Sequence, residues 1–151
     1  MKFLPLLAAS YALVLTAFAA DSTVVFNEIQ YNPSVGQQEF IELRNLNGVD
    51  VDISGWRIDG GVDYTFPAAT VVAGGGYVVV YGTTGAKVFT GQLNNGGETL
   101  RLRNLNGRIM DELTYDHTGD WPLGADGSGV TLSRRTATAA GGASADRKSV
   151  V

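Results

Sequence analysis

The chain has 151 residues, 20 glycines, no cysteine, 44% hydrophobic residues and a formal net charge of -4. Its length fits one domain, and the lack of cysteine excludes a disulfide scaffold, a thiolate metal site and a cysteine nucleophile. The single histidine, His117, excludes a site that needs two imidazoles, and the acidic balance disfavours nucleic-acid binding, which depends on Lys and Arg contacts to phosphate.

Residues 1–19 have the three-part layout of a secretory signal peptide. Lys2 gives a basic start, residues 3–20 carry no charge, and Ala17-Phe18-Ala19 supplies the small residues of a cleavage site. A membrane anchor is the alternative, but the stretch is barely long enough to span a bilayer and contains Pro5. We expect a secreted or extracytoplasmic protein, cleaved near Ala19, with no transmembrane segment in the mature chain.

Residues 22–135 are expected to form the folded domain, and their pattern is that of strands. Short runs of Val, Ile, Tyr, Phe and Thr alternate with Gly, Asn, Asp and Pro clusters, without apolar residues at helical spacing. This pattern predicts an all-β fold, an antiparallel sandwich or barrel. The uninterrupted apolar run at residues 77–81 predicts a central strand covered on both faces. The expected strands are residues 23–31, 39–45, 49–53, 56–59, 63–66, 76–82, 98–105, 108–115 and 130–134.

A six-residue sequence, Leu-Arg-Asn-Leu-Asn-Gly, occurs twice, at residues 43–48 and 102–107. Each copy ends in Asn-Gly between two expected strands, which predicts a hairpin with a type I′ turn at both places. Two copies are too few for a repeat protein, so we attribute the likeness to shared turn chemistry.

The core is expected to contain the large apolar residues that alternate along these strands. The candidates are Ile29, Ile41, Leu43, Ile53, Trp56, Phe66, Val78, Val80, Leu100, Leu102, Ile109 and Leu113.

The end of the chain differs in composition from the domain. Residues 136–145 are mostly Ala, Gly, Ser and Thr, which is typical of a flexible linker. Residues 146–151 are what the DNA string GATCGGAAGAGCGTCGTG encodes, and this string resembles the start of a common sequencing adapter. We interpret these six residues as a translated artefact, the alternative being a genuine short basic tail. On the first interpretation the natural reading frame continues and the domain is one module of a larger protein.

Short motifs follow one another along residues 24–134. They are residues 26–29 (Phe-Asn-Glu-Ile), 31–33 (Tyr-Asn-Pro), 39–45 (Glu-Phe-Ile-Glu-Leu-Arg-Asn), 52–56 (Asp-Ile-Ser-Gly-Trp), 64–67 (Tyr-Thr-Phe-Pro), 74–80 (Gly-Gly-Gly-Tyr-Val-Val-Val) and 93–100 (Leu-Asn-Asn-Gly-Gly-Glu-Thr-Leu), with Asp111, Tyr115, Trp121 and Pro122. In this order they resemble the lamin-tail domain family in its bacterial, exported form. The resemblance implies an immunoglobulin-like antiparallel β-sandwich.

The family's bacterial members are commonly fused to secreted nucleases, spore-coat-type kinase domains or surface modules. The resemblance therefore implies a non-catalytic interaction or adhesion module of an exported, larger bacterial protein. One alternative is the N-terminal accessory domain of an exported nuclease or kinase whose catalytic part is missing from this chain. The expected ligand is a protein or a glycan, bound by loops or strand edges.

Two groups of residues could in principle form a catalytic site. His117 lies beside Asp116 and near Asp120, but Ser128 lacks the surroundings of an activated nucleophile, and Ser133 is the only other nearby serine. We therefore expect no catalytic residues in this chain.

Glu28 and Glu42 form the second arrangement, because they fall on adjacent expected strands and could face each other as the carboxylate pair of a glycosidase. We expect them instead to form cross-strand ion pairs with Arg44, Arg101 or Arg103.

Calcium is a further alternative, as the ion of a calcium-stabilised structural domain. Hard cations bind several carboxylate and carbonyl oxygens from loops, although no EF-hand pattern is present. No other cofactor is expected. The candidate ligands are Asp50, Asp52, Asp59 and Asp63 in one stretch, and Asp116 and Asp120 with Asp111 and Asp126 in another.

Overall fold

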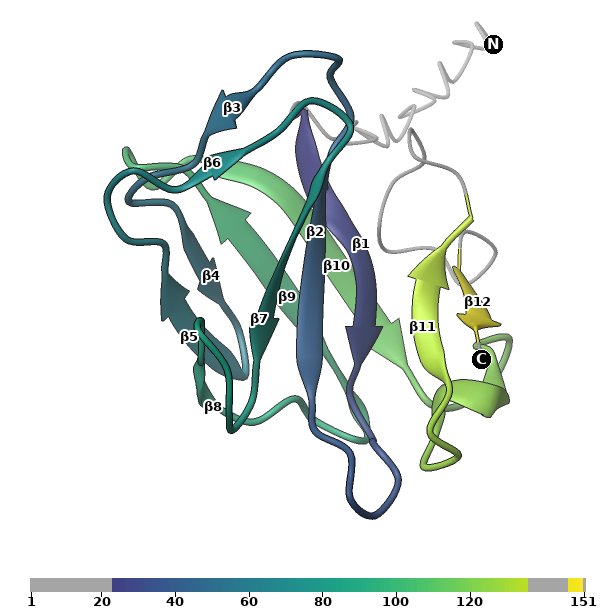
Figure 1. Cartoon of the computed structure of the whole chain (residues 1–151). Coiled ribbons are helices and arrows are strands. Elements are labelled where there is room, and N and C mark those ends of the chain that lie inside the picture. The colour runs from purple at the N-terminus through teal and green to yellow at the C-terminus, as the bar shows by residue number, and fades with distance from the viewer. Residues whose placement is uncertain (1–22, 136–146, 151) are drawn as a thin grey trace, which may run out of the picture.

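Two five-stranded sheets face each other in the computed structural model, which describes residues 23–135 and 147–150 (Figure 1). The first sheet contains, in spatial order, β12 (Arg147–Val150), β11 (Thr131–Arg134), β1 (Val24–Gln30), β2 (Phe40–Asn45) and β7 (Tyr77–Tyr81). The second contains β10 (Ile109–Asp116), β9 (Gly97–Arg103), β4 (Arg57–Asp59), β5 (Val62–Thr65) and β8 (Thr90–Gly91). A two-stranded sheet of β3 (Val51–Asp52) and β6 (Val71–Val72) and a short 3-10 helix, η1 (Leu123–Ala125), complete the described elements.

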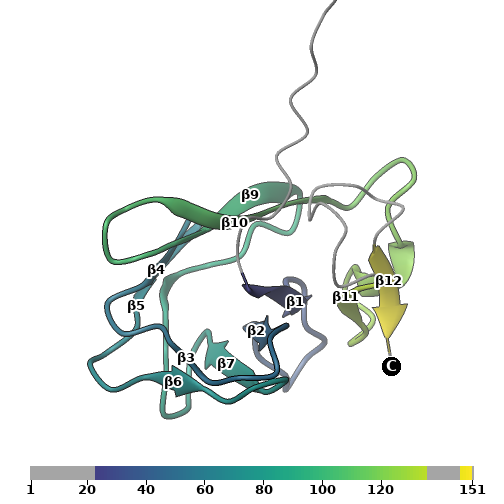
Figure 2. The same cartoon turned by 90° about the horizontal axis from the view of Figure 1, so that it is seen from above.

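All pairs between these strands are antiparallel, and the two sheets make the immunoglobulin-like sandwich expected from the sequence. Figure 2 looks along the strands, with β4, β5, β9 and β10 on one side, β1, β2 and β7 on the other, and β11 and β12 beyond β1. Each expected strand is present with its ends within two residues. The pattern misses β6 and β8, which have two residues each, and β12.

The core lies between the two sheets, where apolar residues from both inner faces meet. Trp56 and Val78 are partly buried against it. Ile109 is 42% exposed, so its assignment to the core is wrong. A register shift between Ile109 and Asp111 reverses the alternation and turns Ile109 to the outer face, opposite Arg103. The other predicted core residues are buried: Ile29, Ile41, Leu43, Ile53, Phe66, Val80, Leu100, Leu102 and Leu113.

The two copies of the repeated hexapeptide make different connections. The second copy closes the β9–β10 hairpin, as predicted. Its turn is not type I′, because Gly107 alone has a positive φ, of 79°. The amide of Gly107 donates to the carbonyl of Asn104 (2.8 Å), which fits a type I turn followed by a glycine bulge.

The first copy does not close a hairpin, so that prediction is wrong: β2 pairs with β1 and β7, whereas β3 pairs with β6. The first asparagine of this copy, Asn45, is buried. Its Nδ2 donates to the carbonyls of Val49, Val72 and Ala73 at 2.8, 3.0 and 3.1 Å. These bonds tie the chain to the β6–β7 connection. The predicted shared turn chemistry is nevertheless present, since Asn45 Oδ1 accepts the amide of Asn47 just as Asn104 Oδ1 accepts the equivalent amide.

The run at residues 77–81 is also placed differently from its prediction. β7 is the last strand of the first sheet, not a central one, and Tyr77 is 53% exposed. The guanidinium carbon of Arg44 lies over the ring of Tyr77, 5.4 Å from the ring centroid. This cation–π contact covers one face of the exposed ring.

The expected signal peptide (1–19) and linker (136–145) lie outside the described residues. Four of the six residues that we interpret as an artefact, Arg147–Val150, pair with β11 as β12. Within residues 23–135 and 147–150, no helix is long and apolar enough to cross a membrane.

Candidate functional site

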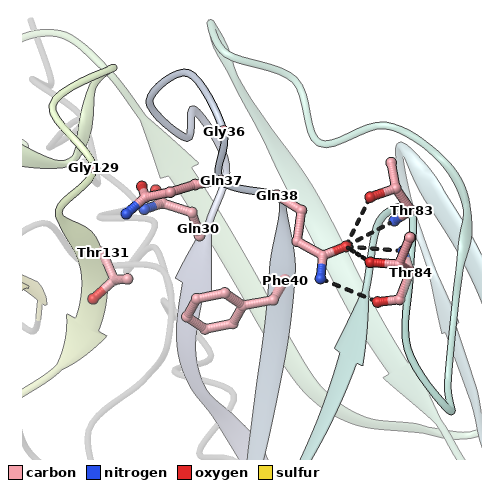
Figure 3. A pocket seen from close by; sticks show the side chains of 9 residues that line it. All are labelled: Gln30, Gly36, Gln37, Gln38, Phe40, Thr83, Thr84, Gly129 and Thr131. Atoms are coloured by element: carbon pink, nitrogen blue, oxygen red, sulfur yellow. Dashed lines mark hydrogen bonds between the residues drawn. The ribbon is translucent and has the colours of Figure 1, made fainter.

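A polar groove of about 470 Å³ lies at the end of the first sheet where β1 ends and β2 begins (Figure 3). The β1–β2 loop, the start of β11 and the loop after β7 form its walls. No wall residue carries a charge. We call this feature the polar groove; its lining residues are Gln30, Gly36, Gln37, Gln38, Phe40, Thr83, Thr84, Gly129 and Thr131.

One wall of the polar groove is held by the amide of Gln38. Its Oε1 accepts the backbone amides of Thr83 (3.3 Å) and Thr84 (2.9 Å) and the hydroxyl of Thr83 (2.8 Å). Its Nε2 donates to the carbonyl of Thr84 at 3.0 Å. Figure 3 shows these bonds joining the β1–β2 loop to the loop after β7. This wall is therefore fixed before any ligand arrives.

The opposite wall contains two more glutamines. Gln37 is held within its own loop, where the hydroxyl of Ser34 donates to Gln37 Oε1 at 3.0 Å. Gln30, the last residue of β1, is only 3% exposed, and its Oε1 has no hydrogen-bond partner among the described residues. Phe40 lies directly opposite Gln30 in the β1–β2 register and is half-buried. An amide and an aromatic ring thus lie side by side on the floor of the groove.

The predicted calcium ligands lie in several places, and all except Asp120 have a hydrogen bond or ion pair described below. Asp50 accepts the amide of Gly74 at 3.0 Å, and Asp52 accepts the amide of Ser54 at 2.8 Å. The first bond joins two loops that are distant in sequence, whereas the second is a contact within one turn.

Asp59 and Asp63 form ion pairs with Arg103 and Arg57 on the outer face of the second sheet. Asp116 accepts the amide and the hydroxyl of Thr118, both at 2.8 Å. Within the part of the chain that the structure describes, no three carboxylate or imidazole groups, those of Asp116 and Asp120 included, come close enough to hold a metal ion.

Asp111 and Asp126 are structural in different ways. Asp126 accepts a hydrogen bond from Asn32 Nδ2 at 2.6 Å and joins the β1–β2 loop to the loop before β11. Asp111 is buried, and its Oδ2 accepts both the amide of Phe26 (2.8 Å) and the guanidinium of Arg134 (3.0 Å). Burial raises the pKa of the Asp111 carboxyl despite the nearby Arg134 charge.

His117 and the two serines do not form a catalytic triad. Nδ1 of His117 lies 3.0 Å from the carbonyl of Gly96 and 3.5 Å from Asp116 Oδ1. The hydroxyl of Ser128 donates to the carbonyl of Gly124 instead of an imidazole, and Ser133 is buried on β11.

Glu28 and Glu42 do face each other, in direct register on β1 and β2. The hydrogen-bond partner of Glu42 is Asn27, whose Nδ2 donates to Oε1 at 2.7 Å. Burial is the main cause that raises the pKa of Glu42, and the charge of Glu28 adds to it.

The expected arginine partners of these two carboxylates belong elsewhere, so that prediction is wrong for Arg101 and Arg103. Arg101 pairs with Glu112 at 2.9 Å, and Arg103 pairs with Asp59, both in the second sheet. Arg44 alone acts on Glu42, as a nearby positive charge that lowers its pKa.

Two buried tyrosines from the family motifs serve the core. Tyr31 and Tyr115 pack with ring centroids 4.9 Å apart, and burial raises the pKa of Tyr31 to about 12. The hydroxyl of Tyr115 donates to the carbonyl of Asn94 and to Glu98 Oε1, each at 3.0 Å, and burial raises its pKa further. These phenols are protonated and tied to the fold.

Sequence reasoning missed the polar groove entirely. Its walls come from three segments, residues 30–40, 83–84 and 129–131, and glutamine and threonine have no spacing that marks a site. The one local signal is the polar run Gln37-Gln38 in a loop between two strands.

A comparison with protein families matches the Lamin Tail Domain model to residues 17–117, more than half of the chain. No curated protein matches the chain at a significant level.

Proposed function

The chain belongs to the lamin tail domain family, an immunoglobulin-like class of non-catalytic interaction domain, and from this premise we propose that it is a binding module of an exported protein. Such a module acts by presenting a surface to a ligand, here a protein or a glycan outside the cytoplasm. Adhesion of a larger protein to that ligand is the biological role that we propose.

The observation that carries this proposal is the polar groove. Its hydrogen-bonding walls are held in place by Gln38 and its two threonine partners, and a preformed site loses less entropy on binding. Gln30 and Phe40 lie in register on its floor, so an aromatic ring stands among the polar side chains. These features suit a site that binds a ligand without catalysing a reaction on it.

Export is supported by the sequence of residues 1–19. The test is to express the whole chain in a bacterium with these residues in place and to determine the N-terminus of the protein recovered outside the cytoplasm. We expect a chain that begins close to Ala20. Recovery of an uncleaved chain from the cytoplasm would overturn this part of the proposal.

Binding is tested by retention of the purified full chain on insoluble extracellular materials: peptidoglycan sacculi, cellulose, chitin and an extracellular protein matrix. We expect retention on at least one material, at a salt concentration that removes non-specific ionic contacts. If none retains the chain, the binding role is wrong.

Membership of a larger protein is tested by sequencing the gene beyond the codon for Ala145. A reading frame that continues into an anchoring domain supports adhesion, whereas one that continues into a nuclease or kinase supports the accessory role. A frame that stops after Val151 would contradict both the artefact interpretation and the larger protein.

A further inference from the structure

The outer side of β11 is covered by the four-residue strand β12, and the two lie next to each other in both Figure 1 and Figure 2. They pair antiparallel from Thr131, opposite Val150, to Arg134, opposite Arg147. Without β12, β11 would be the last of the described strands of the first sheet, and the backbone groups of such an edge are a template for another strand. We call this feature the β11 edge: the side of β11 that β12 covers.

The register of β12 is not set by a tight turn. β11 ends at Arg134 and β12 begins at Arg147, so residues 135–146 join these neighbouring strands, whereas hairpin loops usually have about 2–5 residues. A connection of that length does not fix which residues pair. The register must therefore come from contacts between β12 and the β11 edge itself, and a separate polypeptide can make the same contacts.

The first of these contacts is a buried seat for an arginine. The side chain of Arg147 is fully buried, and its Nη1 donates to the carbonyl of Asn27 at 3.4 Å. Asn27 lies at the register shift of β1, where a bulge takes it out of the regular ladder with β2. Burial raises the pKa of the Asp111 carboxyl, and the positive charge of Arg147 opposes that rise, so the two groups attract each other.

The outer face of the β11 edge favours a second basic residue. Lys148 is exposed and lies opposite Ser133, which is itself opposite Glu28 of β1. Glu28 in turn lies opposite Glu42 of β2. Two strand spacings, about 10 Å in all, separate Lys148 from Glu28 across the sheet. A basic residue in this row reduces the repulsion between the two facing carboxylates.

The third contact limits the size of a residue on the incoming strand. Ser149 lies opposite Leu132, and a Cβ atom built on Gly124 of η1 would lie 2.8 Å from Ser149 Oγ and 3.0 Å from Ser149 Cβ. The glycine therefore leaves room for a small side chain on the strand. At the far end, the hydroxyl of Thr131 donates to the carbonyl of Val150 at 3.3 Å.

The charge of the domain also favours a basic ligand. Residues 22–135 contain 13 acidic and 8 basic side chains, a net charge of -5. Such a surface attracts a basic segment and speeds its association. The β11 edge presents a row of backbone groups, which an extended polypeptide matches with its own backbone.

We propose that the β11 edge binds an extended basic segment of a partner protein as an added antiparallel strand. An arginine takes the seat of Arg147, a basic residue the place of Lys148, and a small residue the place of Ser149. This inference goes beyond the proposed function, because it assigns a protein-binding site apart from the polar groove; Thr131 borders both. If residues 146–151 are an artefact, β12 shows what the edge accepts, and if they are genuine, β12 is a competitor within the chain.

The test uses the full chain and a synthetic peptide with the sequence of residues 145–151, capped at both ends. Lys148→Pro together with Ser149→Pro prevents β12 from pairing, because one of two consecutive amides must face β11 and proline has none to donate. A tethered strand competes at an effective concentration of about 1 mM, so the peptide should bind this variant about tenfold or more tightly than the natural chain. It should also shift the ¹⁵N backbone signals of Asn27, Leu132 and Ser133.

Two control peptides test the arginine seat. A peptide with Arg147→Glu should bind the proline variant about tenfold or more weakly, because the buried seat then holds a charge that Asp111 repels. A scrambled peptide of the same composition keeps the net charge and should also bind weakly. Equal binding of the scrambled peptide would show a general attraction between charges and would overturn the seat.

Two glycine variants, made in the proline variant, locate the site. Gly124→Val should weaken peptide binding about tenfold or more, because its side chain enters the space of the small residue. Gly48→Val is the matched control, since Gly48 is exposed, has no atom within 4 Å of an added Cβ and, like Gly124, has no positive φ. Equal binding by these two variants would overturn the β11 edge as the site.

The natural chain provides a second measurement that does not need the proline variant to fold. Excess peptide should displace β12 and move the ¹⁵N signals of Lys148 and Val150 to those of an unpaired tail. No displacement at millimolar peptide, with no binding to the proline variant, would overturn the inference. A dimer that the natural chain forms and the proline variant does not would overturn the foreign partner and identify β12 of a second copy as the occupant. Retention on extracellular materials does not depend on these changes, so it tests the proposed function separately.

Discussion

Asp111 on β10 and Arg134 on β11 form an ion pair between the two sheets, with Arg134 Nη2 3.0 Å from Asp111 Oδ2. Their side chains are 2% and 1% exposed. The same carboxylate oxygen accepts the amide of Phe26 on β1. One buried charge therefore links a strand of the second sheet to two strands of the first, and this explains why an aspartate occupies an inward position on β10.

Asp111→Ala is expected to destabilise the protein by about 3–5 kcal/mol, because it removes the acceptor that the buried amide of Phe26 and the buried guanidinium of Arg134 share. The control is Asp63→Ala, which removes the partner of Arg57 in an ion pair whose two side chains are 50% and 49% exposed. It should cost about 1 kcal/mol or less. Urea unfolding at neutral pH measures both, and equal losses would contradict the structural role of Asp111.

Stability is expected to rise as the pH falls from about 7 towards about 5. Burial raises the pKa values of Glu39, Glu42 and Asp111, so the folded state binds protons more tightly than the unfolded state in this range. The free energy of unfolding therefore decreases as pH rises through the folded pKa values.

At lower pH the trend reverses. Hydrogen bonds from Ser54 and Thr118 lower the pKa values of Asp52 and Asp116, whose contributions are lost as these groups become protonated. Urea unfolding over a pH series measures the profile. Glu42→Gln keeps an oxygen for Asn27 and should flatten the slope above about pH 5. A stability that instead increases steadily towards neutral pH would contradict the raised pKa values.

Gly97→Ala is expected to cost about 3 kcal/mol. Gly97 begins β9 with a φ of +103°, and a Cβ atom there would lie 2.5 Å from the carbonyl oxygen of Tyr115 on β10. The matched control is Gly36→Ala, where φ is +89° and nothing lies within 4 Å of the added atom. That variant has only the backbone strain, about 1–2 kcal/mol. Thermal unfolding of the pair separates the close approach from the strain; similar Tm losses would show that the contact with Tyr115 is unimportant.

Strand positions were predictable because side-chain alternation is a local property. Residues 39–45 alternate between core and outer face, and Ile41 and Leu43 are buried as that pattern predicts. Strand partners were less accessible. The choice between a hairpin and a crossing after Asn47 depends on the carbonyls at residues 72 and 73, which are far away in sequence.

The candidate site was the least predictable part of the molecule. Clustered aspartates in the sequence suggested a calcium site, yet the carboxylates of Asp59, Asp63 and Asp111 are paired with arginines. The groove instead combines neutral side chains from three distant segments, so it exists only after folding.

The two asparagines of the repeated hexapeptide are expected to differ in their contribution to stability, although their sequence surroundings are identical. Asn45→Ala removes the donor shared by three carbonyls around a fully buried side chain. Asn104→Ala removes an acceptor for the amides of Asn106 and Arg108 in an exposed turn.

A buried group that loses its partner costs about 1–3 kcal/mol, whereas water can replace the lost partner in the turn. We therefore expect Asn45→Ala to cost about 3 kcal/mol or more and Asn104→Ala about 1 kcal/mol. Urea unfolding of the two variants and the double variant measures this, and the separate costs should add because the sites share no partner. Equal costs would mean that Asn45 acts only as a turn residue and that the tie to the β6–β7 connection adds no stability.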